Sequence, residues 1–190
     1  MKKNSGKWFR LAGVLVLMSG IFVALAWVCP GRMTGGGSVF KGSNQVVTAQ
    51  VDNNNRVTHG FELHCGPEPP ALPATPNNLQ INWGGPGDKH RFHLDVLTSS
   101  DCFYDPSVGS PNPPPAGFNT MVGDGTGSFD GKDGAATIHF TFTDAGEPGG
   151  TNGAPPPDTA AYLIINGSGT VVLSVPATAL TFGNHQAHAH

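Results

Sequence analysis

The stretch Thr137-Ile-His-Phe-Thr-Phe-Thr143 alternates apolar and polar side chains at nearly every step. Such alternation is typical of a β-strand with one buried face, because successive side chains point to opposite faces of a sheet. The segments 78–83 and 91–96 show the same period of two. The apolar sides of the three segments hold Ile138, Phe140, Phe142, Leu79, Ile81, Trp83, Phe92, Leu94 and Val96. We therefore expect three strands that bury these side chains.

The rest of the chain also favours strands over helices. Further strands are expected at 45–51, 57–65, 161–165 and 170–175, separated by turns rich in glycine, asparagine and aspartate. The 190 residues include 27 glycines and 17 prolines, which weaken helix interiors. The sequence predicts an all-β fold, namely an antiparallel β-sandwich of jelly-roll or immunoglobulin-like type that follows an N-terminal signal helix.

The N-terminus has the pattern of a secretory signal peptide. Lysines and an arginine precede an uncharged apolar run over 11–28, and Ala24-Leu25-Ala26 offers the small residues of a cleavage site. We expect cleavage after Ala26 and export to the outside of the cell, to its surface or to the periplasm. An uncleaved anchor is an alternative, although 18 residues are near the short limit for spanning a bilayer. Lipid attachment at Cys29 is a third interpretation. We expect contact with the membrane only through an uncleaved leader or a lipidated Cys29.

The chain divides into one main domain with short flanking segments. The expected parts are a signal peptide over 1–26, an N-terminal extension over 27–36, a β-sandwich domain over 37–184 and a His-containing tail over 185–190. Removal of the leader takes four of the ten basic residues and none of the thirteen acidic ones, which leaves a formal charge of −7. We do not expect an acidic chain of this kind to bind nucleic acid, because phosphate recognition needs clustered lysine and arginine.

The sequence has three cysteines: Cys29, Cys65 and Cys102. They allow one disulfide within the chain, and the third cysteine then stays outside it. Exported proteins enter an oxidising compartment, where disulfides form and persist. We expect Cys65 to pair with Cys102, because both lie beside strand-like segments, while Cys29 lies at the new N-terminus.

Four short motifs carry a resemblance to a known family. They are Arg32-Met-Thr-Gly-Gly-Gly-Ser-Val-Phe40, Thr58-His-Gly-Phe-Glu-Leu-His-Cys65, Asp144-Ala-Gly-Glu-Pro-Gly149 and Gly183-Asn-His-Gln-Ala-His188. In this order they resemble the post-COAP-1 domain, a secreted bacterial β-rich domain. The resemblance implies export and a β-sandwich-like module of bacterial surface proteins, and it implies no reaction. The chain departs from the family where Thr151-Asn-Gly-Ala-Pro-Pro-Pro157 is inserted before Asp158.

Two acidic segments are candidates for calcium binding. Asp144, Glu147 and Asp158 surround a bent segment with glycine and proline, and Ca²⁺ prefers carboxylate and carbonyl oxygens from such loops. The alternative is a solvated acidic turn between strands. The segment 123–134 carries Asp124, Asp130 and Asp133 among glycines, and it is interpreted as a hairpin loop. Ca²⁺ is the only cofactor that we expect.

The histidines are candidates for a transition-metal site. By alternation His64, His93 and His139 lie on the polar faces of their strands, where imidazoles of adjacent strands can converge on Zn²⁺ or Cu²⁺. His59 and His90 lie in phase with the apolar faces, where a hydrogen-bonded structural role is expected.

No catalytic motif is present: the sequence lacks a G-x-S-x-G elbow, an HExxH helix and a CxxC pair. We therefore expect a non-enzymatic exported module with a structural, adhesive or binding role. An alternative is a Ca²⁺-stabilised domain that binds carbohydrate or protein, with Phe103 and Tyr104 as exposed ligand-binding aromatics. A third interpretation is a secreted hydrolase that uses Glu62 beside His64. The expected partner is an extracellular protein or polysaccharide.

Overall fold

The computed structural model describes residues 31–40, 56–66, 77–85, 88–109, 114–147 and 157–189. This part of the chain forms nine β-strands: β1 (Gly31–Phe40), β2 (Arg56–His64), β3 (Asn78–Gly85), β4 (Asp88–Phe103), β5 (Thr120–Phe129), β6 (Lys132–Thr143), β7 (Thr159–Asn166), β8 (Val171–Ala179) and β9 (Phe182–Ala189). The predicted signal peptide, Cys29 and the predicted strand at 45–51 lie outside the described residues. In the described ranges, no helix is long and apolar enough to cross a membrane.

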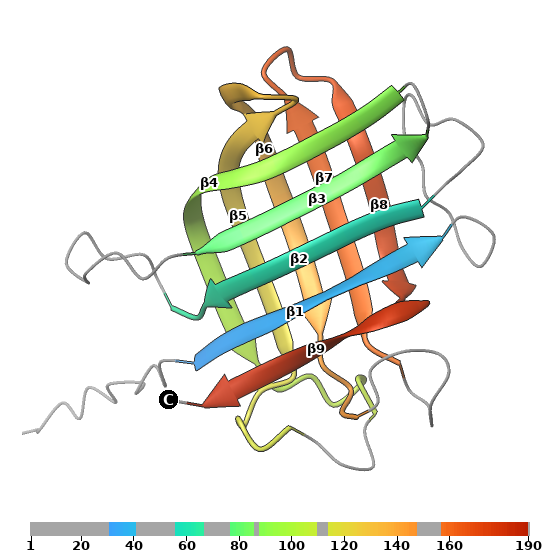
Figure 1. The fold of residues 1–190 in the computed structure, drawn as a ribbon. Coiled ribbons are helices and arrows are strands. Elements are labelled where there is room, and N and C mark those ends of the chain that lie inside the picture. The colour runs from blue at the N-terminus through green and yellow to red at the C-terminus, as the bar shows by residue number, and fades with distance from the viewer. Residues whose placement is uncertain are drawn as a thin grey trace, which may run out of the picture.

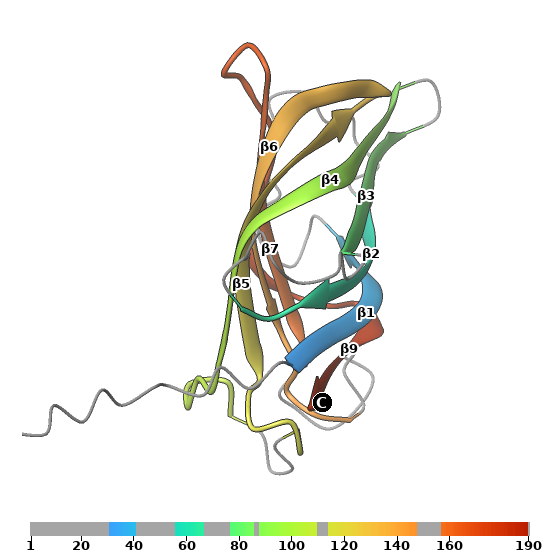
Figure 2. The ribbon, with the colours of Figure 1, turned by 90° about the vertical axis from the view of Figure 1, so that its left-hand side faces the viewer.

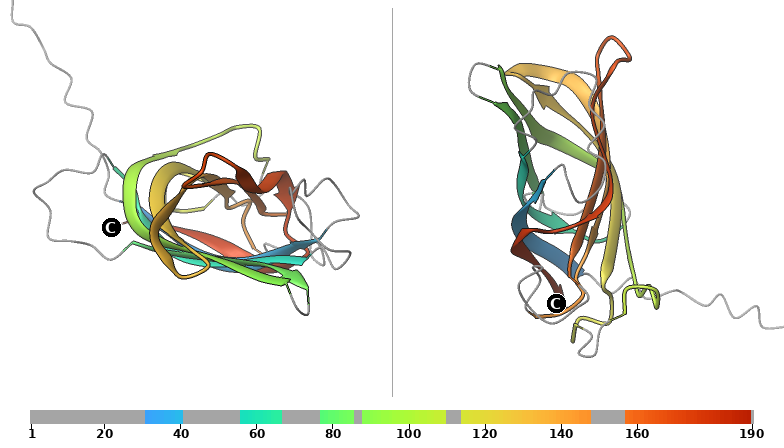
Figure 3. Two further views of the ribbon diagram at one scale, coloured as in Figure 1. Left: turned by 90° about the horizontal axis from the view of Figure 1, so that it is seen from above. Right: turned by 90° about the vertical axis from the view of Figure 1, so that its right-hand side faces the viewer.

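The nine strands form one antiparallel sheet in the order β8-β7-β6-β5-β4-β3-β2-β1-β9. The sheet curls, so that the half with β9, β1, β2 and β3 faces the half with β5 to β8 (Figures 1, 2 and 3). The prediction of an all-β antiparallel fold is confirmed. The finer prediction of a jelly-roll or immunoglobulin-like sandwich is not, because all the strands belong to one hydrogen-bonded sheet in which most neighbours follow one another along the chain.

Strand β4 makes the curl, because it begins in one half of the sheet and ends in the other (Figure 2). It has 16 residues, and its register with β5 shifts between Leu94 and Val96 and between Leu97 and Ser99. Each irregularity bends the strand and breaks the alternation of its side chains. The expectation that Val96 is buried is therefore wrong: Val96 is 52% exposed, and Leu97 points into the core instead.

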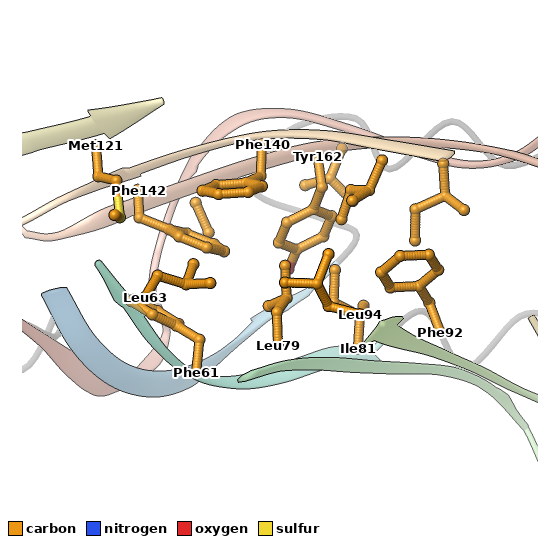
Figure 4. Close-up of a cluster of buried hydrophobic side chains, with 14 of the residues drawn as sticks. Phe61, Leu63, Leu79, Ile81, Phe92, Leu94, Met121, Phe140, Phe142 and Tyr162 are labelled. Carbon is orange, nitrogen blue, oxygen red and sulfur yellow. The ribbon is translucent and has the colours of Figure 1, made fainter. Parts of the chain in front are cut away.

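The core lies between the two halves of the sheet (Figure 4). The predicted inward residues of β3 and β6, together with Phe92 and Leu94 of β4, are buried. Phe61 and Phe142 stack across the interior, with ring centroids 4.2 Å apart. The alternation in the sequence thus predicted correctly which face of each regular strand is buried.

The predicted disulfide is confirmed between Cys65 and Cys102, with Sγ atoms 2.01 Å apart. It connects the residue after β2 with the second-last residue of β4. Because β2 and the end of β4 belong to opposite halves, the bond holds the curled sheet together at one end.

Two predicted boundaries are wrong because they fall inside strands. Residues 31–36 belong to β1 rather than to an N-terminal extension, and residues 185–189 belong to β9 rather than to a tail. Strand β9 pairs with β1 from Gly31 to Ser38. A Cβ atom at Gly35 would lie 2.6 Å from the carbonyl oxygen of Asn184, so only glycine allows this approach. The sequence predicts an extension here, whereas these glycines permit close strand packing.

The expected loop over 123–134 is also largely strand, since β5 runs to Phe129 and only Asp130 and Gly131 form the turn. Gly123, Gly125 and Gly127 all face the core. A Cβ atom at Gly125 would lie 2.4 Å from Leu94 Cδ1 and 2.8 Å from the carbonyl oxygen of Val96. The glycines let β5 lie close to its neighbours, which no side chain would allow.

Candidate functional site

Asp144 and Asp158 follow β6 and precede β7, and both are buried. Asp158 accepts hydrogen bonds from the backbone N–H of Ala145 at Oδ1 (2.8 Å) and from that of His185 at Oδ2 (2.7 Å). Asp144 accepts from Gly146 N–H (2.8 Å) and from Ala187 N–H (2.7 Å). All four carboxylate oxygens therefore bind backbone donors, and two of these donors belong to β9.

These two carboxylates take the place of a neighbouring strand. In the described sheet β9 is hydrogen-bonded to β1 alone, so its other edge presents N–H groups without a strand partner. Asp158 and Asp144 bind two alternate N–H groups on that edge. Burial raises the pKa of Asp144, and it raises the pKa of Asp158 to about 7, although the two N–H donors on Asp158 oppose that rise.

Glu147, the third candidate calcium ligand, is exposed and accepts hydrogen bonds from the side chains of Asn184 (2.7 Å) and Gln186 (2.8 Å). The charges of Asp144 and Glu147 contribute to the raised pKa of Asp158. In the described part of the chain, no three His, Cys, Asp or Glu side chains are grouped as a metal site requires. The acidic groups instead attach β9 to the segment between β6 and β7.

A buried hydrogen-bonded chain connects the same strands through the core. His59 Nε2 lies 2.8 Å from His185 Nε2, His185 Nδ1 lies 3.0 Å from the carbonyl oxygen of Thr143, and Tyr162 Oη lies 3.4 Å from His59 Nδ1. A carbonyl oxygen only accepts, so Nδ1 of His185 carries its proton. It follows for neutral rings that His59 donates to His185 and that Tyr162 donates to His59.

Burial keeps both imidazoles of this hydrogen-bonded chain, those of His59 and His185, neutral. It lowers the pKa of His59 well below its usual value, with a further contribution from His185, and it lowers the pKa of His185 to about 4. Phe61 and Phe142 pack against both rings. The expected structural role of inward-facing His59 agrees with this arrangement. His185, which was expected in a tail, is fully buried.

The three histidines predicted as a metal site are spread over the outer surface. His139 binds Asp124, His93 is in register with Gln80 and Ser128, and the backbone N–H of His64 donates to Asn77 Oδ1. Glu62, the candidate acid–base residue beside His64, forms an ion pair with Arg32 at 2.8 Å.

An open groove lies on the outer face of β4 to β7. It consists of two adjoining hollows of about 540 and 340 Å³ that share Thr98 and Asp124. The remaining lining residues are Ser99, Ser100, Asp101, Val122, Gly123, Gly125, Thr126, Thr137, Ile138, His139, Leu163 and Ile165. Hydroxyl groups, two carboxylates, an imidazole and aliphatic side chains line the groove, and no lysine or arginine does.

Asp124 is the centre of the groove's polar network. Its Oδ1 accepts a hydrogen bond from His139 Nδ1 (2.8 Å), and its Oδ2 accepts one from Ser99 Oγ (2.9 Å). The bond to His139 is the main reason why the pKa of Asp124 is lowered, so the carboxylate stays charged. The order Ser–Asp–His differs from that of a hydrolytic triad, in which the imidazole contacts the nucleophilic hydroxyl.

Phe103 and Tyr104 are exposed, at 45% and 53%, as the sequence predicted. Phe103 lies two residues beyond Asp101 on β4, and residues at this spacing share one face of a strand. Asp101 lines the groove, so the ring of Phe103 continues the same outer face.

No protein-family model, curated protein or solved structure matches this chain. The resemblance to the post-COAP-1 domain therefore stays a prediction.

The sequence predicts most of these residues as candidates, but it does not predict which of them contact one another. The sequence predicts a loop at Asp124 and groups His139 only with other histidines, whereas the two bind each other across β5 and β6. The signal that predicts this contact is the alternation of Gly123, Asp124 and Gly125, in which the small residues face inward and the acid faces outward.

Proposed function

We propose that this protein is an exported, non-enzymatic module that binds an extracellular polymer through the outer groove of β4 to β7 and so acts in adhesion. The observation that carries the proposal is the groove itself, in which side-chain hydroxyls, Asp124 and His139 are exposed on one rigid sheet face. Binding sites combine apolar surface with a few placed polar groups, and this lining has both.

The leader-like N-terminus and the Cys65–Cys102 disulfide support export. Disulfides persist in oxidising compartments and are rare in the reducing cytosol. We expect the exported protein to begin at Trp27. Cell fractionation followed by mass spectrometry of the N-terminus tests this, and an intact leader on a protein that stays in the cytosol would contradict it.

A binding role is favoured over hydrolysis by the interactions of the titratable groups. Asp158 and Asp144 bind backbone N–H groups, Glu62 binds Arg32, and Asp124 is hydrogen-bonded on both oxygens. These interactions give each acid a structural or positioning role.

The test is co-sedimentation of the mature protein with insoluble neutral polysaccharides, anionic polysaccharides and fibrous matrix protein. The variant Phe103→Ser/Tyr104→Ser should lose about tenfold in affinity if the outer face of β4 contacts the polymer, because two exposed rings are removed. Phe182→Ser is the matched control, since Phe182 is as exposed as Tyr104 but lies on β9. Failure to bind any polymer would refute the proposal, while equal losses in both variants would exclude the two rings from the contact.

A further inference from the structure

The outer face of β4 to β7 is organised in rows that cross the strands. One row, here called the central row, consists of Ser99 on β4, Asp124 on β5, His139 on β6 and Leu163 on β7, each in register with the next. All four side chains are at least partly exposed. Neighbouring strands are about 4.8 Å apart, so the row presents one contact group at each such step.

Two flanking rows differ from the central row in chemistry. On one side Thr126 and Thr137 are in register with each other, and Thr137 with Ile165. On the other side Asp101 is in register with Val122, and Val122 with Thr141. The central row thus holds the hydrogen-bonded Ser–Asp–His network, and the flanking rows supply hydroxyl and methyl groups together with the carboxylate of Asp101.

The charge of the groove selects among polymers. Asp101 and Asp124 are the acidic groups of the lining, and the lining holds no lysine or arginine. A polyanion would bring like charges together, which opposes binding. A neutral ligand rich in hydroxyl groups can donate to Asp124 and exchange hydrogen bonds with Ser99 and the threonines.

Resting on the proposed function, we propose that the groove binds a neutral linear polysaccharide that lies across the strands along the central row, with one sugar over each strand from β4 to β7. The strand spacing is comparable to the length of one sugar ring in an extended chain. Sugar hydroxyls then meet Ser99, Asp124 and His139 in turn, and the apolar face of the last sugar packs on Leu163.

The depth of the groove follows from β5. Gly123 and Gly125 face the core, and a Cβ atom at Gly123 would lie 2.4 Å from the ring of Phe140. The missing side chains let β5 lie close to the interior, and Asp124, between these glycines on the outer face, lines both hollows. The register of the sheet therefore builds the site without a loop.

The experiment measures the affinity of the mature protein for β-linked glucose oligomers of two to six sugars by calorimetry. Affinity should rise with each added sugar up to four and then level off, because four strands carry the row. His139→Ala should weaken binding of the longest oligomer about tenfold, as expected for a lost hydrogen bond to a polar partner. Asn82→Ala on β3, in the opposite half of the sheet, should leave affinity unchanged.

The orientation is tested by Leu163→Ser and Val122→Ser. A chain across the strands requires Leu163 for oligomers of four or more sugars, whereas a chain along β5 requires Val122 for all lengths. A loss with Val122→Ser and none with Leu163→Ser would overturn the proposed orientation, as would affinity that does not depend on length. Binding of neutral polysaccharide without these signatures would refute this inference alone, while no binding of any polymer would refute the proposed function.

Discussion

The two edges of the sheet, β8 and β9, are protected in different ways. An edge strand presents N–H and C=O groups that can pair with another chain. On β9, the carboxylates of Asp144 and Asp158 bind the backbone N–H groups of Ala187 and His185. On β8, Pro176 lacks an N–H, and the register with β7 shifts twice. One edge is thus closed by buried carboxyl groups and the other by irregular backbone, so we expect very different sensitivities to substitution.

The largest effect is expected for Asp158→Ala. The change leaves the N–H groups of Ala145 and His185 without their acceptor, at a cost of about 2–5 kcal/mol in the free energy of unfolding. Denaturant unfolding at neutral pH measures it. Asp95→Ala, which removes an exposed carboxylate of β4, is the control and should change stability little. Equal effects would show that β9 does not depend on Asp158.

Gly183→Ala tests the approach of β9 to β1. Gly183 has a φ of 110°, and a Cβ atom there would lie 2.1 Å from the carbonyl oxygen of Gly36. We expect a loss of about 2–3 kcal/mol, from backbone strain and from displacement of β9. Gly169→Ala is the matched control, because its φ is 79° but nothing lies near its Cβ position. It should cost about 1 kcal/mol, and a larger loss there than at Gly183 would argue against the close approach.

The buried histidines make β9 sensitive to acid. The pKa of His185 is lowered to about 4 in the folded state, and that of His59 is also lowered, so the unfolded chain binds more protons below pH 6.5. Their contribution to stability is present above pH 6.5 and is lost as the pH falls, by about 1.4 kcal/mol per pH unit for each histidine. The stability of the wild type relative to His59→Gln/His185→Gln should therefore fall between pH 7 and pH 5. A constant difference would contradict the buried neutral pair.

Asp158 should show the opposite dependence on pH. Its pKa is raised to about 7 in the folded state, so the folded chain holds a proton that the unfolded chain releases above pH 3.8. This contribution is present at low pH and is lost as the pH rises through 7. The wild type should lose stability relative to Asp158→Asn between pH 5 and pH 8 in denaturant unfolding. A difference between the two proteins that did not change with pH would show that the carboxyl is ionised throughout.

Calcium removal should have the smallest effect. Because the four oxygens of Asp144 and Asp158 already accept backbone hydrogen bonds, we expect the same Tm with added calcium and with a chelator. Differential scanning calorimetry measures it. A rise of several degrees with calcium would support the site that the sequence predicted at Asp144, Glu147 and Asp158.

The difference between regular and irregular strands also explains which parts of the fold could be predicted. Period-two alternation identified the buried faces of β3 and of residues 137–143 in β6, because both segments pair in regular register and have one buried face. It failed at Val96, where β4 is irregular, because an extra residue reverses the alternation. The curl of the sheet depends on that bend, so the sequence predicted strands but not the single sheet they form.

The candidate site was predicted less completely, because its contacts join residues that are distant in sequence. The pair Asp124 and His139 depends on the register of β5 and β6, and the pair His59 and His185 on that of β2, β1 and β9. Composition and spacing do not predict the register between two strands when their glycine-rich segments are interpreted as loops. The cysteine pair was the exception, because oxidation and two candidate strands left few alternatives.

The link between Cys65 and Cys102 also affects how the molecule responds to proteolysis. The bond joins residues 37 positions apart, and the chain between them includes β3 and most of β4. A protease that cuts once between these positions produces two pieces that remain one covalent molecule until a reductant is added. A protein outside the cell can therefore be nicked there without shedding a fragment.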